Sequence, residues 1–124
     1  MLEELKERGF YQQSTHPEEM EEHLEKDRAC CYIGFDPTAD SMHVGHLIPL
    51  IGLAHMQRGG HRISALMGGG TAMIGDPSGK TEIRKMLTEE QLQSNIQGML
   101  PQFERFLDFS KDAGWSIMLN GCVT

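Results

Sequence analysis

Two histidines separated by Val-Gly, His43 and His46, are the residues whose type and spacing best suit chemistry on a ligand. They follow an apolar run typical of a strand and open an apolar segment typical of a helix. Free N–H groups and the helix dipole at such a junction favour an anion, and Gly45 lets a ligand approach the backbone closely. Histidines three residues apart can face the same ligand, so this pattern indicates a phosphate site. A hydrogen-bonded structural role is the alternative for either histidine alone.

The stretch GDPSGKT, residues 75–81, resembles a phosphate-binding P-loop but does not fit its spacing. The Walker pattern is G-x-x-x-x-G-K-[ST], and the interval between Gly75 and Gly79 is one residue too short. Pro77 also removes a backbone N–H from a loop that needs such groups to bind phosphate. The spacing therefore excludes a Walker P-loop.

Charged residues of this stretch still suit attack on an α-phosphate with pyrophosphate leaving. Catalysis of that kind depends mainly on positioning and charge stabilisation. Lys80 and Arg84 are cations that can follow the departing pyrophosphate, and Asp76 is a carboxylate that can bind a substrate ammonium group. A solvated loop is the alternative interpretation of these cations, and their spacing alone favours it.

A metal site is not predicted. No third ligand stands at a recognisable spacing from the histidine pair, and His55 and His61 are expected on a helix surface and at the entry to a strand. An odd number of cysteines with an adjacent pair fits neither a disulfide framework nor a zinc knuckle. These cysteines are Cys30, Cys31 and Cys122.

The elements that must position these residues alternate between strand and helix patterns. Such a series predicts an α/β fold with a parallel sheet, preceded by an N-terminal helical segment. The expected helices are 17–27, 44–58 and one opening at 88; the expected strands are 29–35, 61–70 and 114–120.

Two prolines bear on the helix limits. Proline costs little within the first turn of a helix, so Pro49 predicts that the 44–58 helix begins near residues 45–46. TEEQ at 88–91 is a capping-box pattern, and Pro101 is expected to kink or restart the helix that it opens. The apolar positions of that helix repeat at helical spacing: Leu92, Ile96, Met99, Leu100 and Phe103.

Composition indicates one soluble domain in a reducing compartment. The chain has 124 residues, a net charge of −7 and 39% hydrophobic residues, and no apolar run approaches the roughly 20 residues that span a bilayer. Most of the excess negative charge lies within residues 1–27, and the remainder shows no broad basic face for nucleic acid. We expect a cytoplasmic protein without a membrane segment.

Two long motifs resemble the bacterial tyrosyl-tRNA synthetases, a family of class I aminoacyl-tRNA synthetases. They are YIGFDPTADSMHVGH at 32–46 and ALMGGGTAMIGDPSGKTEIR at 65–84, and the likeness runs from about residue 6 to Asn120. The resemblance implies an incomplete Rossmann-type catalytic domain at 29–124 after an N-terminal helical segment at 1–28. It implies ATP-dependent activation of tyrosine to tyrosyl-adenylate and transfer to tRNA(Tyr), with Mg²⁺ accompanying ATP.

Site residues carry over from the resemblance by position. Thr38, His43 and His46 are similar to the phosphate-binding set, Gly45 to the glycine beside adenine, and Gly34 and Asp36 to residues near the nucleotide. Tyr32, Thr71 and Asp76 are similar to the tyrosine pocket, with Tyr32 at the phenol hydroxyl and Asp76 at the ammonium group. Lys80 and Arg84 are similar to cations that hold pyrophosphate in the transition state.

Gly121-Cys122-Val123-Thr124 departs from the family pattern, which continues with a lysine-rich KMSKS-type loop and an RNA-binding region. A codon set for these four residues, read one base earlier, gives Trp-Leu-Arg-Asp, similar to the family's next segment. We therefore expect a reading frame truncated by a deletion or frameshift, and a separate chain that is poorly stable and nearly inactive. The relatives are homodimers through regions largely beyond residue 110, so a dimer is a weaker expectation here.

Two other functions remain open from the sequence. A stand-alone nucleotidylyltransferase shares the histidine-x-glycine-histidine turn and a similar length, although the second motif argues against it. A non-catalytic nucleotide-binding relic is the other alternative.

Overall fold

The computed structural model describes residues 1–68, 88–110, 113–119 and 122–123, with side chains described up to residue 110. The elements follow one another as α1 (Leu2–Glu7), α2 (Pro17–Lys26), β1 (Cys30–Phe35), α3 (Val44–Arg58), β2 (Arg62–Gly68), α5 (Glu89–Phe103), β3 (Ala113–Leu119) and β4 (Cys122–Val123). The predicted alternation of strands and helices is confirmed.

The strands form one sheet in the order β1-β2-β3-β4, in which β1, β2 and β3 are parallel. The predicted parallel sheet is thus confirmed, and α3 and α5 make its two crossovers. The short strand β4 was not predicted, and it runs antiparallel to β3 with Leu119 opposite Cys122. A tight connection can join antiparallel strands, whereas parallel strands need a long crossover, so β4 pairs directly after β3.

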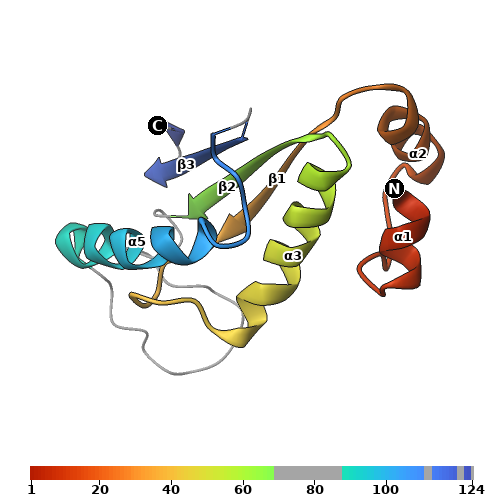
Figure 1. Cartoon of the computed structure of the whole chain (residues 1–124). Coiled ribbons are helices and arrows are strands. Elements are labelled where there is room, and N and C mark those ends of the chain that lie inside the picture. The colour runs from red at the N-terminus through yellow and green to blue at the C-terminus, as the bar shows by residue number, and fades with distance from the viewer. Residues whose placement is uncertain (69–87, 111–112, 120–121, 124) are drawn as a thin grey trace.

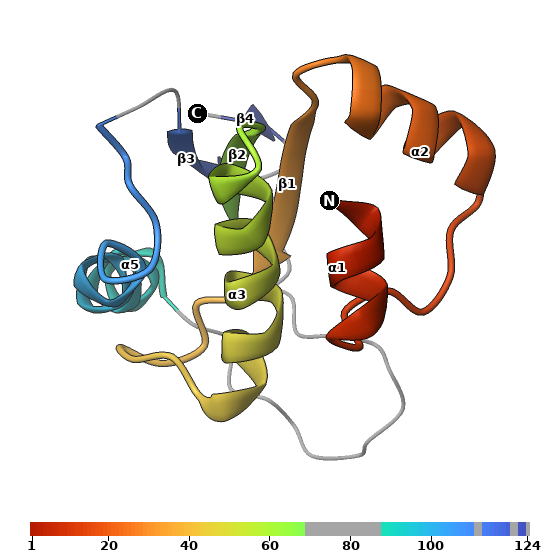
Figure 2. The same ribbon diagram turned by 45° about the vertical axis from the view of Figure 1, so that its right-hand side comes forward.

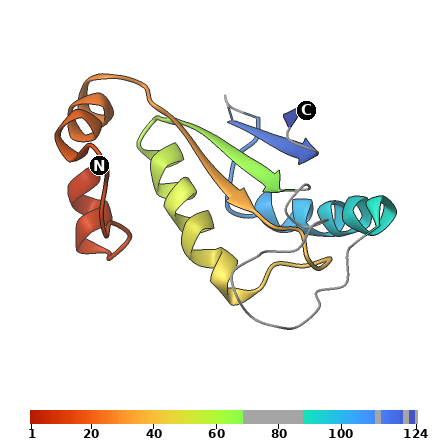
Figure 3. The ribbon, with the colours of Figure 1, turned by 180° about the vertical axis from the view of Figure 1, so that it is seen from behind.

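Helices α3 and α5 cover the same face of the sheet, below the strands in Figure 1. Strand β2 alternates strictly, with Ile63, Ala65 and Met67 buried and the residues between them half-buried. The other face of β1 carries Tyr32, which is 71% exposed, and seen from behind no helix of the described chain crosses in front of β1 and β2 (Figure 3). The core of the described residues therefore lies on one side of the sheet.

Helix α3 has the predicted bounds 44–58, but Pro49 lies in its interior, so the start near residues 45–46 that the proline indicated is wrong. Proline lacks the N–H that would bond the carbonyl of Gly45 one turn earlier. The helix continues because Leu50 and Leu53, directly after the proline, are almost completely buried in the core. The free energy of that burial, about 1.5–3 kcal/mol for a leucine, offsets one lost hydrogen bond.

The predicted capping box at the start of α5 is confirmed. The Gln91 N–H donates to the Thr88 hydroxyl at 3.2 Å, and the Thr88 N–H donates to the Gln91 side-chain oxygen at 3.1 Å. Pro101 was expected to kink or restart the helix. The helix continues through it to Phe103, so the restart is wrong, and the kink stays a prediction. Four of the five predicted apolar positions are fully buried and Leu100 is half-buried.

The N-terminal helix α1 packs along α3 (Figure 2) and explains a second difference. His55 was expected on the helix surface, but its side chain is only 10% exposed. Its Nδ1 lies 3.5 Å from the Glu4 carboxylate, and its ring lies 5.5 Å from that of Phe10. Docking of α1 covers this position, and a helical pattern alone cannot show such docking. His61 stands before β2, as predicted, and its Nδ1 accepts from the Ala29 N–H.

Within the described ranges, no helix combines the length and apolar character that crossing a membrane requires.

The packing of the core predicts that two phenylalanines near each other in the sequence contribute very differently to the free energy of unfolding. Phe103 is completely buried and meets Phe35 edge to face at 4.9 Å, whereas Phe106 is 42% exposed. We expect Phe103→Ala to lower the free energy of unfolding by about 3–5 kcal/mol, or to prevent folding. Phe106→Ala should cost far less. Urea unfolding followed by circular dichroism measures both, and equal losses would contradict this description of the core.

Candidate functional site

The two histidines cap α3 reciprocally at its junction with the segment that follows β1. His43 is the N-cap residue, with extended backbone at φ −96° and ψ 171°. Its Nδ1 accepts from the Gly45 N–H at 3.1 Å, and the His43 N–H donates to Nδ1 of His46 at 3.4 Å. The rings stack with centroids 3.7 Å apart and an angle of 23° between them. The structure thus places both imidazoles side by side at the helix N-terminus.

This cap determines which ring nitrogen carries the proton. A nitrogen that accepts from an N–H must itself be unprotonated, so the proton of each neutral ring resides on Nε2. Both Nε2–H groups remain for a ligand. Together with the positive end of the helix dipole, two such donors suit a phosphate oxygen.

Burial lowers the pKa of His46 from its ordinary value, and the nearby charge of His43 lowers it further; Asp36 acts weakly in the opposite direction. His46 is therefore predominantly neutral at pH 7. It acts as a hydrogen-bond donor through Nε2 rather than as a fixed positive charge, and the two stacked rings avoid carrying adjacent charges.

A hollow of about 220 Å³ opens beside this pair at the carboxyl end of β1. It is smaller than the roughly 300–1,000 Å³ of a complete ligand pocket, so it has room for part of a nucleotide. The structure brings together in its lining five of the six candidate nucleotide-binding residues: Gly34, Asp36, Thr38, His43 and His46. The carboxyl ends of parallel strands are where α/β folds bind ligands.

Gly45, the sixth candidate, has a structural role that the sequence did not reveal. A Cβ at this position would lie 2.9 Å from Cε1 and 3.0 Å from Nδ1 of the His43 ring. Glycine therefore leaves room for His43 to fold back over the first turn and accept from the Gly45 N–H. A side chain here would press against the cap itself.

Two lining residues were not identified as site residues from the sequence, Phe35 and Pro49. The ring of Phe35 meets that of His46 nearly edge-on at 5.9 Å, so it supports the inner side of the histidine pair. The sequence predicted Phe35 as the last residue of a strand and Pro49 as a constraint on the helix start. Their position beside an anion-binding pattern was the only signal available.

The remaining candidates separate into one described residue and a group outside the described residues. Tyr32 lies on the face of β1 that no described helix covers, two residues before Gly34, so the two residues lie on the same side of the strand. Thr71, Asp76, Lys80 and Arg84 lie outside the described residues.

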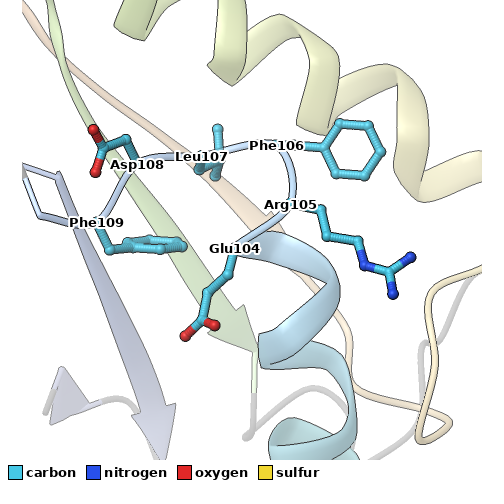
Figure 4. Close-up of a pocket in the computed structure, with 6 residues that line it drawn as sticks. All are labelled: Glu104, Arg105, Phe106, Leu107, Asp108 and Phe109. Atoms are coloured by element: carbon cyan, nitrogen blue, oxygen red, sulfur yellow. The ribbon is translucent and has the colours of Figure 1, made fainter.

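Two larger hollows lie away from the histidine pair. One, of about 440 Å³, is lined by residues 104–109 after α5, and Figure 4 shows that its side chains spread from a single turn rather than converging. The other, of about 410 Å³, lies by the amino ends of β1 and β2, where Arg28 and His61 line it. Neither contains a recognised motif.

Among the described residues, no group of three or more His, Cys, Asp or Glu side chains could hold a metal ion.

The histidine pair makes a prediction about pH. His43→Asn keeps a good N-cap acceptor and removes one imidazole, so it should raise the pKa of His46 toward the ordinary value of about 6.5. Burial should still keep that pKa below the ordinary value. Titration of the ring resonances by NMR measures it, and a pKa of His46 above 6.5 in the unmodified chain would contradict the geometry.

The lowered pKa values of His46 and His61 make the stability of the fold depend on pH. Folding lowers the pKa values of His46 and His61, in both cases mainly through burial, so the unfolded chain binds more protons just below pH 6.5. Stability should therefore fall as pH drops from about 6.5 toward the folded-state pKa values, and the loss should end below them.

Comparison with known proteins shows the family. Residues 24–123 match the family model of class I tRNA synthetases of the W and Y type. The tyrosine–tRNA ligase of Clostridium botulinum is 56% identical over 127 residues, and that of Caldanaerobacter subterraneus is 59% identical over 120 residues. Each alignment covers 97% of this chain but only 31% and 29% of the relative, respectively.

Solved structures agree with this assignment. A C-terminally truncated mitochondrial tyrosyl-tRNA synthetase of Coccidioides posadasii superposes with a TM-score of 0.73 and 26% identity over 91% of this chain and 33% of its own. The corresponding protein of Aspergillus nidulans gives 0.60 and 29% over 74% and 29%. The expected Rossmann-type fold of the class I enzymes is confirmed. The chain belongs to the class I tRNA synthetase family of the tryptophan and tyrosine enzymes.

Proposed function

We propose that this chain forms the ATP-binding part of a tyrosine–tRNA ligase. The observation that carries the proposal is the hollow at the end of β1, where His43 and His46 present two Nε2–H donors at a helix N-terminus. Two relatives that are 56% and 59% identical to this chain are named tyrosine–tRNA ligases. The substrates that follow are ATP and tyrosine, with Mg²⁺ accompanying ATP.

In the proposed reaction, a carboxylate oxygen of tyrosine attacks the α-phosphorus of ATP. The bond from that phosphorus to the bridging oxygen breaks, and pyrophosphate leaves with the electron pair. The Nε2–H groups of His43 and His46 and the Thr38 hydroxyl hold phosphate oxygens, while Lys80 and Arg84 follow the pyrophosphate. Fixed donors of this kind lower the barrier without any covalent intermediate on the protein.

The tyrosine end of the site is proposed on the uncovered face of β1. Tyr32 is largely exposed there and lies on the same side of the strand as Gly34, which lines the hollow. Its hydroxyl is proposed to contact the substrate phenol, while Asp76 binds the ammonium group and Thr71 completes the pocket. Adenine is proposed to approach the backbone at Gly45, with Asp36 beside the nucleotide.

Transfer to tRNA(Tyr) and dimer formation are proposals for the longer protein, because the chain spans about 30% of the curated relatives it matches. Residues 1–28 are proposed as a helical segment that precedes the catalytic domain at 29–124. A cytoplasmic location is likewise proposed, as translation substrates are found there.

ATP binding tests the histidine pair directly. We expect ATP to shift the ring resonances of His43 and His46, and His43→Asn to weaken ATP binding about tenfold, since hydrogen bonds to charged groups contribute about 1.5–3 kcal/mol. Adenosine, which lacks phosphate, is the matched control and should bind both proteins equally. An NMR titration in which ATP leaves both rings unperturbed would contradict a phosphate site here.

Exchange of labelled pyrophosphate into ATP tests the reaction. We expect slow exchange that requires tyrosine and is not supported by tryptophan, the other substrate class of this family. The chain with both His43→Asn and His46→Gln should show none. Adenylyl transfer to a phosphorylated acceptor without any response to tyrosine would favour a nucleotidylyltransferase instead.

A further inference from the structure

The segment between β1 and α3, residues 36–43, brings Asp36, Thr38 and His43 to the hollow. Its backbone makes one hydrogen bond within itself, from the Thr38 N–H to the Asp36 carbonyl at 2.9 Å. A single internal bond cannot fix eight residues, because ordering each residue costs backbone conformational entropy. Contacts from elsewhere must therefore hold this segment in shape.

Helix α5, which is distant in the sequence, supplies those contacts. The segment runs beside this helix in Figure 1. The Asn95 side-chain N–H donates to the Pro37 carbonyl at 2.9 Å, and the Met42 N–H donates to the Gln102 side-chain oxygen at 2.7 Å. Both bonds are partly buried. They anchor the two ends of the segment, one before Thr38 and one next to His43.

Gly98 lies between the two amides and brings the helix backbone close to the middle of the segment. A Cβ at residue 98 would overlap the Asp40 carbonyl oxygen and would lie 3.1 Å from the carbonyl carbon. Positions 95, 98 and 102 are spaced three and four apart, so they form one side of the helix. This side is next to the one that carries Ile96 and Met99 into the core.

We propose that Asn95 and Gln102 are positioning residues that hold residues 36–43 so that Thr38 and His43 meet the nucleotide phosphates. The inference rests on the proposed ATP site. Neither amide lines the hollow, so each acts through the backbone of the segment. The bond from Asn95 to Pro37 positions Thr38, and the bond between Gln102 and Met42 positions His43.

Hydrogen-bond direction makes the proposal sharply testable. A carbonyl can only accept and an N–H can only donate, so Asn95 must act as a donor and Gln102 as an acceptor. Asn95→Asp removes the donor and sets a carboxylate against the Pro37 carbonyl. Gln102→Glu keeps an acceptor for the Met42 N–H. The two changes are nearly isosteric and add the same charge to the same helix. Asn95→Asp is expected to disturb residues 36–43, whereas Gln102→Glu is expected to leave them in place.

If the added negative charge acted only through the helix dipole, Gln102→Glu would be more disruptive than Asn95→Asp. Negative charge is unfavourable near a helix C-terminus, and residue 102 is next to the end of α5 whereas residue 95 is in its middle. Gln97→Glu is the matched control, because Gln97 is exposed on the same helix.

The experiment measures backbone amide hydrogen exchange and ATP affinity by NMR on the 124-residue chain at pH 7.5. We expect Asn95→Asp to speed exchange at Thr38, whose N–H belongs to the peptide group that Asn95 holds, about fivefold and to weaken ATP binding by about the same factor. Gln102→Glu and Gln97→Glu should stay within about twofold of the unmodified chain. Gln102→Ala should speed exchange at Met42.

The possible failures are distinguishable. If ATP does not bind the unmodified chain, the proposed function is overturned, and amide exchange without nucleotide still decides the positioning role. If Asn95→Asp and Gln102→Glu change exchange at Thr38 and Met42 equally, the positioning role is overturned while the ATP site can stand. Equal loss of global stability in urea would show that a variant acts on the whole fold rather than on residues 36–43.

Discussion

The contact between Phe35 and Phe103 is the constraint on which the candidate site depends. Phe35 is the last residue of β1 and Phe103 the last of α5, and their rings meet edge to face at 88°. Phe35 also touches the ring of His46. One buried side chain therefore joins the sheet, the second crossover helix and the histidine pair. The edge-to-face geometry favours one relative orientation of the rings, which limits how β1 and α5 can move against each other.

The histidine pair shows how a structural role and a chemical role can share one side chain. Each Nδ1 is used within the chain, either by the Gly45 N–H or by the His43 N–H. This use orients both rings and leaves both Nε2–H groups pointing away from the cap. The structural interpretation of a histidine and the functional one are often treated as alternatives. Here the cap supports the proposed phosphate-binding role, since it selects the tautomer that can donate.

The two helices that cover the face of the sheet have different structural roles at the hollow. Helix α3 contributes its N-terminus to the hollow, whereas α5 stays outside the hollow and holds the backbone of residues 36–43. A short segment with little internal bonding is suited to a ligand site because its exposed groups remain available. Its order then has to come from a rigid neighbour. Neutral amides serve this purpose well, as their hydrogen bonds to backbone groups do not change with pH.

The sequence by itself determined the alternation of β1, α3, β2, α5 and β3, because strand and helix patterns depend on local periodicity and on caps such as Thr88 and Gln91. It also determined the histidine pair and the family, since both reside in contiguous motifs. Only the tertiary structure decided what covers His55, why Gly45 must lack a side chain and how α5 holds residues 36–43. Contacts such as that of Gln102 with Met42 join residues 60 apart in the chain. Local patterns carry no information about such pairs, because these contacts exist only once the core has brought α5 against the end of β1.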